Sequence, residues 1–152
     1  MIPAPAPSPD PRPTRHRQLY WRAAVVWLGI VVAEVLHGVL RSIFLVPYVG
    51  LHRSNQIGVF TASLIILVIV RFSIGWLLKA EPEARLSRLL GVGAAWTVLM
   101  LVFEWSAGHY VFGRTWDELA QDYRLAQGGL LPLGMLVLLF SPLIAARRWR
   151  SR

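Results

Sequence analysis

Four segments of this chain are long and apolar enough to cross a lipid bilayer, and they decide its class of fold. We place them at about residues 20–41, 57–78, 89–112 and 129–146. The hydrocarbon core of a bilayer is about 30 Å thick, which takes roughly 20 residues of α-helix to cross. A backbone in contact with lipid must satisfy its own hydrogen bonds, and the alternating pattern of a transmembrane barrel is absent. The sequence therefore predicts an all-α integral membrane protein, a four-transmembrane-helix bundle with up-down topology.

The composition agrees with this class. Of the 152 residues, 55% are hydrophobic and 16% are charged, whereas soluble domains typically have about 45–50% and about 25%. The chain contains no cysteine. This excludes disulfides, thiolate metal sites, iron–sulfur clusters and a cysteine nucleophile.

Basic residues are divided unequally between the two sides of the predicted bundle. Four of them, Arg41, Arg53, Arg114 and Arg124, flank one side. The eleven on the other side are Arg12, Arg15, Arg17, Arg22, Lys79, Arg85, Arg88, Arg147, Arg148, Arg150 and Arg152. Because Lys and Arg are enriched in cytoplasmic loops, we expect both termini in the cytoplasm. The strong excess of arginine over lysine is typical of GC-rich bacterial genomes, so we expect a multi-pass protein of a bacterial inner membrane.

The net charge of +8 has a simple explanation in this topology. The basic residues flank apolar helices and are hardly interleaved with aromatic residues, so we expect no nucleic-acid partner. The expected partners are the lipid bilayer, with anionic headgroups at the cytoplasmic face, and a second copy or a larger membrane complex.

The chain divides into three parts. We expect residues 1–18 to be a disordered, Pro/Arg-rich cytoplasmic tail, residues 19–148 the transmembrane domain, and residues 149–152 a basic end. In the second outer connection, Thr115 and Glu118 have the spacing of a capping box. They predict a short amphipathic helix on the outer surface.

Polar residues inside the predicted spans suggest a site. Glu34 and Glu104 lie about 10 and 12 Å from the outer ends of their helices, and His37 and His109 lie nearer those ends. Charged groups in a membrane need partners, water or a function. Glu34, His37 and Arg41 share one helix face, whereas His109 faces the same site as Glu104 only if the helix bends at Gly108. The candidate ligand- or proton-binding residues are Glu34, His37, Arg41, Arg53, Asn55, Gln56, Glu104, His109 and Arg114.

These residues allow several interpretations. In the first, the two glutamates neutralise Arg41, Arg53 or Arg114 in buried ion pairs that hold the helices together. In the second, a cationic or protonatable ligand binds between Glu34 and Glu104. In the third, the polar face completes another protein, which would make this chain an accessory subunit.

Redox and enzymatic roles are the two alternatives that remain. Glu34-x-x-His37 is half of a di-iron motif, and the two remaining candidates, Glu104 and His109, are too few to complete it. His37 and His109 could instead be the axial ligands of haem b. An enzyme acting on an outer-leaflet lipid or lipid-linked substrate would use His37 or Glu104 as general base and the three outer arginines as a phosphate clamp. No familiar hydrolase or phosphate-loop motif is present, so we expect a binding, transport or accessory role ahead of catalysis.

Overall fold

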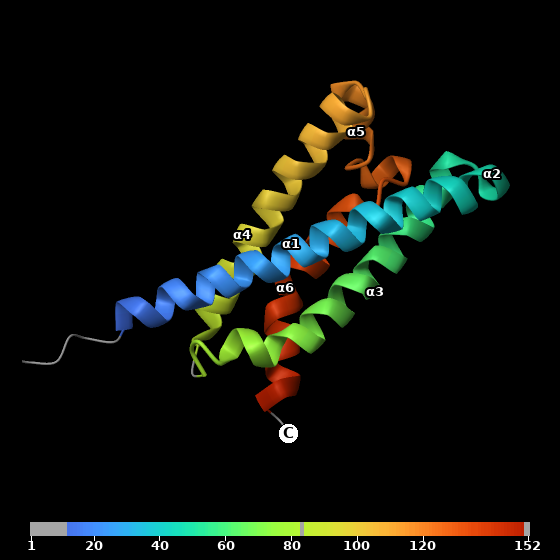
Figure 1. Ribbon diagram of the computed structural model, residues 1–152. Helices are drawn as coiled ribbons and strands as arrows, with labels where there is room; N and C mark the ends of the chain where they lie inside the picture. Colours follow the sequence, from blue (N-terminus) through green and yellow to red (C-terminus); the bar gives the residue numbers. More distant parts are fainter. Residues whose placement is uncertain (1–11, 83, 151–152) are drawn as a thin grey trace, which may run out of the picture.

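All regular elements among the described residues, 12–82 and 84–150, are helical. The computed structural model in Figure 1 runs in chain order through α1 (Arg12–Phe44), α2 (Val46–Val49), α3 (Leu51–Leu78), α4 (Leu86–Ser106), the π-helix η1 (Ala107–Val111), α5 (Trp116–Gln121), the 3-10 helix η2 (Leu125–Gln127) and α6 (Leu131–Arg150). Four helical stretches are long and apolar enough to cross a membrane, Arg17–Phe44, Leu51–Leu78, Leu86–Val111 and Leu131–Trp149. The prediction of an all-helical chain with four such segments is confirmed.

Several helix boundaries differ from those expected. Helix α1 begins at Arg12, so residues 12–18 of the expected tail are helical, and residues 1–11 lie outside the described part. Helix α3 begins at Leu51 rather than near Ile57, after Gly50 has turned the chain with a φ of 78°. Apolarity marks only the part of a helix that can face lipid, and polar residues such as Arg53 and Asn55 extend a helix equally well once it has started.

The long helices are arranged as a series of neighbouring pairs. Helix α1 packs on α3, α3 packs on α6, and α6 packs on α4. Helix α6 therefore lies between two helices that follow each other in the chain (Figure 1). Their shared core includes Ile30, Ile74, Leu89 and Leu138, all almost fully buried.

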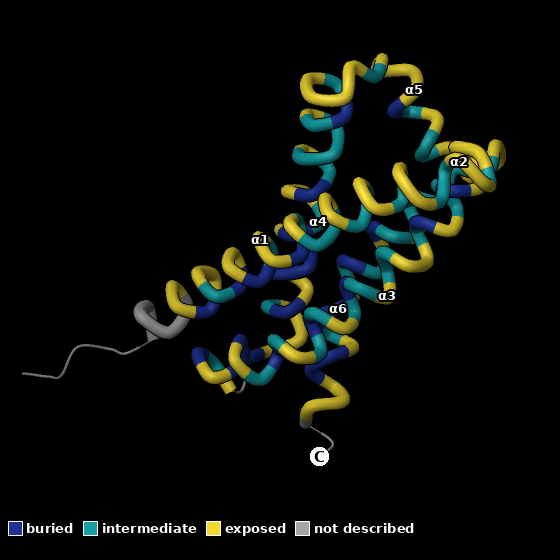
Figure 2. Tube along the Cα trace, turned by 45° about the vertical axis from the view of Figure 1, so that its right-hand side comes forward, coloured by how far each residue is buried: buried dark blue, intermediate teal, exposed yellow. Residues whose placement is uncertain are grey.

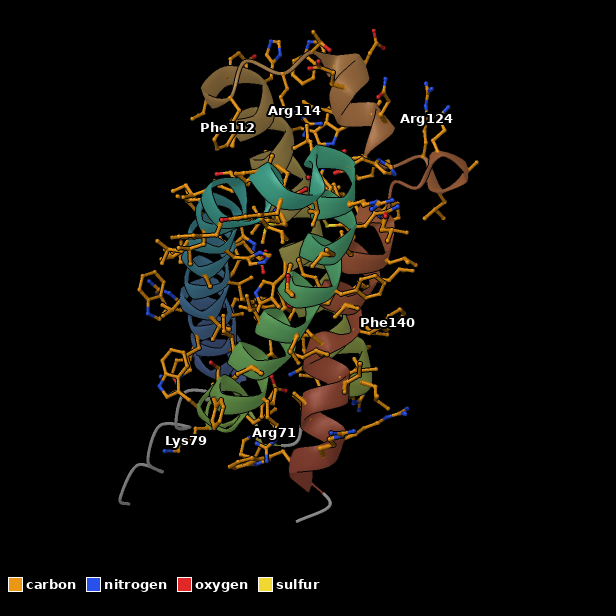
Figure 3. All side chains as sticks on the ribbon, turned by 90° about the vertical axis from the view of Figure 1, so that its right-hand side faces the viewer. Arg71, Lys79, Phe112, Arg114, Arg124 and Phe140 are labelled. Carbon is orange, nitrogen blue, oxygen red and sulfur yellow. The ribbon has the colours of Figure 1, made fainter. Side chains whose placement is uncertain are left out.

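The bundle has two different ends. Helices α2 and α5 lie at one end, and the described chain begins and stops at the other, which we call the termini end (Figure 1). Figure 3 shows Arg114 and Arg124 near the α2/α5 end, Arg71 and Lys79 near the termini end, and Phe140 between them. Apolar surface between two charged ends is what a membrane-spanning bundle requires.

Helices α1 and α4 contact each other over a short stretch only. There, the indole Nε1 of the buried Trp96 donates to the backbone oxygen of Ala23 over 2.9 Å. Dark-blue buried segments gather in this half of the bundle in Figure 2. From this contact the two helices diverge toward the α2/α5 end (Figures 1 and 2).

Close packing of α4 on α6 depends on Gly93. A Cβ atom at this position would lie 1.9 Å from the carbonyl oxygen of Leu139, and a backbone atom cannot move aside cheaply. We expect Gly93→Ala to lower the free energy of unfolding by about 1–3 kcal/mol. Thermal unfolding in detergent, followed by circular dichroism, measures the change.

Gly91 supplies the matched control for this substitution. A Cβ atom at Gly91 would meet nothing within 4 Å, so Gly91→Ala should stabilise the helix by about 0.5–1 kcal/mol. Equal melting temperatures for the two variants would contradict the packing of α4 on α6.

Candidate functional site

Glu34 and His37 lie together on α1, as their spacing predicts. Glu34 Oε2 is 3.8 Å from His37 Nδ1, and His37 Nε2 is 2.8 Å from Thr61 Oγ1 on α3. The Thr61 hydroxyl donates to the carbonyl oxygens of Ile57 and Gly58, so its lone pair accepts the His37 Nε2 proton. His37 thereby ties α1 to α3 and presents Nδ1 to Glu34.

Arg41 turns toward α3 and away from both glutamates. Its guanidinium donates to Asn55 Oδ1, and Nη1 lies 3.4 Å from the hydroxyl of the fully buried Ser54. Its side chain crosses α3 at Gly58, where a Cβ atom would come within 2.9 Å of Arg41 Cδ. Arg41 and Asn55 therefore join the two helices.

The remaining candidates of α3 have different surroundings. Gln56 Nε2 donates to the carbonyl oxygen of Gly128 over 3.3 Å, which fastens the segment after α5 to α3. Arg53 is exposed, and it does not approach the groups that surround Glu34 in any described contact.

The connection between η1 and α6 is a folded cap at the α2/α5 end. The capping box is present: Thr115 Oγ1 accepts from Glu118 N, and Glu118 Oε2 accepts from Thr115 N. Leu119 is buried against Gly108, where a Cβ atom would lie 2.5 Å from Leu119 Cδ2. Arg114 pairs with Asp122 over 2.7 Å. We call residues 113–130 the cap segment.

His109 does not face the glutamates. The α-helix gives way to a π-helix at Ala107, so the helix does change at Gly108. The ring nevertheless stacks on Trp116 with 4.0 Å between centroids, and Nδ1 lies 2.9 Å from the carbonyl oxygen of Arg114. His109 therefore belongs to the aromatic contacts that anchor the cap segment to α4.

Neither haem nor metal ligation fits the two histidines. His37 is directed to Thr61 on α3, and His109 is directed to Trp116 and the backbone of Arg114, so they do not face a common ligand. In the described ranges, no group of three or more His, Asp or Glu side chains is placed to hold a metal ion. His37 and His109 are therefore not arranged as the two axial ligands of a haem.

The buried ion pairs expected for Glu34 and Glu104 are also not formed. Within residues 12–82 and 84–150, ion pairs join Glu81 to Arg88 and Arg114 to Asp122, and Glu34 has His37 as its neighbour at 3.8 Å. Neither glutamate reaches an arginine, because Arg41 and Arg114 are turned to other acceptors. The three arginines of the expected phosphate clamp do not converge either, since Arg53 is exposed.

Glu34 and Glu104 do lie within electrostatic range of each other. The charges that act on Glu104 are those of Glu34, Asp122 and Arg114, although Arg114 is already paired with Asp122. Glu34 Oε1 is buried without a hydrogen-bond partner. The carboxyl groups of Glu34 on α1 and Glu104 on α4 therefore lie in one region, and the nearby cation, Arg114, is already paired with Asp122.

Tyr123 is a site residue that the sequence did not indicate. Its side chain contacts Trp105, with 5.9 Å between ring centroids. Burial, and then the charge of Glu104, raise the pKa of the Tyr123 phenol to about 12, so the hydroxyl keeps its proton at neutral pH. No acceptor for that proton lies within hydrogen-bonding distance among the described residues.

Asp122 was also missed, although a signal was present. Arg114, Glu118 and Asp122 recur at intervals of four residues, which predicts neighbours on one helical face. The structure brings the three together: Arg114 Nη2 donates to the carbonyl oxygen of Glu118, and Nη1 donates to Asp122.

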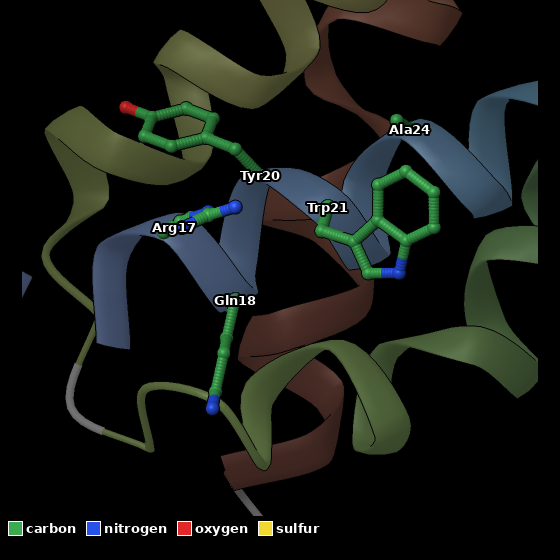
Figure 4. A pocket seen from close by; sticks show the side chains of 5 residues that line it. All are labelled: Arg17, Gln18, Tyr20, Trp21 and Ala24. Atoms are coloured by element: carbon green, nitrogen blue, oxygen red, sulfur yellow. The ribbon is translucent and has the colours of Figure 1, made fainter. Parts of the chain in front are cut away.

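A shallow hollow on α1 lies far from these residues. It is lined by Arg17, Gln18, Tyr20, Trp21 and Ala24 near the termini end (Figure 4). Arginine and aromatic side chains at a helix end are typical of a membrane–water interface, so this hollow needs no ligand to explain it.

Comparison with protein-family models, with curated proteins and with solved structures finds no match to this chain.

Proposed function

We propose that this chain is a multi-pass protein of a bacterial inner membrane that binds a cationic or protonatable ligand between Glu34 and Glu104. In the proposed orientation both termini are cytoplasmic, and the α2/α5 end faces outward. The role is binding or transport, with the two carboxyl groups as the groups that touch the ligand.

This proposal rests on the fact that, among the described residues, the two carboxyl groups lack a compensating positive charge. Glu34 Oε1 is buried without a partner, and Glu104 is subject to the charges of Glu34 and Asp122. Ionised groups in a low-dielectric region are costly unless they are compensated. A bound proton or a bound cation supplies that compensation.

The neighbouring residues have supporting roles in this proposal. His37 orients Glu34 through its contact with Thr61. The pairing of Arg114 with Asp122 keeps the arginine from neutralising Glu104. Tyr123 offers a hydroxyl proton to a carboxylate.

The test is equilibrium dialysis of the purified protein in detergent against tetraphenylphosphonium, a monocation that dissolves in water and in apolar media. Glu34→Gln and Glu104→Gln should each weaken binding by about tenfold or more, since each removes one negative charge from the site. The matched control is Asp117→Asn on the exposed face of α5, which should bind as the wild type does. Unchanged binding by both glutamine variants would overturn the proposal.

A further inference from the structure

The buried face of α1 ends at the level of Glu34. Its buried positions are Leu19, Ala23, Val26 and Ile30, and the same face continues with Glu34. On α4 the buried face runs through Trp96, Met100 and Glu104 to Gly108, which Leu119 of the cap segment covers. Glu34 therefore stands where the packing of α1 stops, and Glu104 lies on the buried face of α4 one turn before the contact with the cap segment.

Beyond this level, the chain carries apolar side chains that are exposed in the described structure. Val35 and Val39 on α1 and Val111 on η1 are among them. Gly38 lies one helical turn beyond Glu34 on the same face, and a Cβ atom at Gly38 would meet nothing within 4 Å. The face of α1 next to Glu34 is thus open at Gly38, and exposed apolar side chains lie on the neighbouring faces.

The α2/α5 end of this space is covered by the cap segment. Gln56 holds the carbonyl of Gly128, and the backbone N–H of Leu131 donates to the carbonyl of Asp122 over 3.3 Å. The charges of Asp122 and Arg114 act on Arg41 and on Glu104, which places the cap segment beside both helices. Toward this end the backbones of α1 and α4 diverge (Figure 2).

We infer that the ligand is a membrane-dissolved amphiphile with one ammonium group, which reaches Glu34 and Glu104 sideways between the diverging halves of α1 and α4. The ammonium group supplies the positive charge that the two carboxyl groups lack. Its alkyl chain stays against the exposed valines and in the lipid, where it keeps its apolar surface out of water. This inference rests on the proposed function and adds the ligand class and the direction of entry.

The experiment compares dodecylammonium with ethylammonium, which share a head group and differ in chain length. The protein is reconstituted in lipid nanodiscs, and binding is measured by isothermal titration calorimetry, with empty nanodiscs as the blank for partitioning into lipid. After that correction, dodecylammonium should bind more tightly by about a hundredfold or more. Equal affinities would overturn the inference.

A second arm blocks the side opening. Gly38→Phe should weaken dodecylammonium binding by about tenfold or more, because the ring fills the space beside Glu34. The control is Gly29→Phe, since Gly29 is equally open but lies about 140° around the helix from Glu34. Unchanged binding by Gly38→Phe would overturn sideways entry. If Gly38→Phe fails to fold, the comparison of the two chain lengths decides alone.

The experiments can refute the amphiphile without refuting the cation site. Binding of tetraphenylphosphonium that depends on Glu34 and Glu104, without a preference for dodecylammonium, supports the cation site and refutes the amphiphile. If no cation binds, both proposals are wrong.

Discussion

The protein with glutamine at both positions 34 and 104 should withstand heat at least as well as the wild type, yet it should bind no monocation. Among the described residues, neither carboxyl group is paired with an arginine, so their removal breaks no ion pair with a strong partner. An amide is cheaper than a carboxylate in a low-dielectric region. We expect the free energy of unfolding to stay within about 1 kcal/mol of the wild type or to rise.

Unchanged stability together with lost cation binding distinguishes a ligand site from a structural role of the two carboxyl groups. Breaking a buried ion pair by removing one partner typically costs about 3–5 kcal/mol. If the carboxyl groups held the helices together, the double variant would melt well below the wild type and would lose binding only because it unfolds. Thermal unfolding in detergent and tetraphenylphosphonium dialysis on the same preparation measure both properties. A large drop in melting temperature would contradict the assignment.

Trp96→Ala should have the largest effect on stability. The side chain is almost fully buried in the core and makes the hydrogen bond that joins α4 to Ala23 of α1. Truncating a buried tryptophan costs about 3–5 kcal/mol through lost burial and the cavity that remains. Because this contact joins α1 to α4, we also expect weaker cation binding.

The control for Trp96 is Trp21→Ala, a change of the same size at a side chain that is 70% exposed. Its effect in detergent should stay within about 0.5 kcal/mol. Thermal unfolding followed by circular dichroism should give Trp96→Ala a much lower melting temperature than Trp21→Ala. Similar melting temperatures would show that Trp96 does not join the two helices.

Hydropathy and local spacing were enough to predict part of this fold. Length and apolarity fix the number of candidate spans, because lipid leaves the backbone few alternatives. The capping box of Thr115 and Glu118 was recognisable because its partners are three residues apart. The contact between Glu34 and His37 follows from helical geometry in the same way.

The sequence could not reveal which helices are neighbours. Hydropathy places segments in a membrane but does not pair them, so the contact of His37 with Thr61, 24 residues away, had no local signal. The direction of His109 depended on Trp116 in the cap segment. The contact with Trp116, and not the bend at Gly108, determines the direction of the His109 ring.

The position of α6 has a consequence for how the chain assembles. A ribosome makes this helix after α3 and α4, yet it lies between them. These two helices leave the ribosome before it as consecutive products of synthesis. They must therefore stay apart, or separate again, until α6 arrives, and the packing among these three helices is completed only after α6 has been translated.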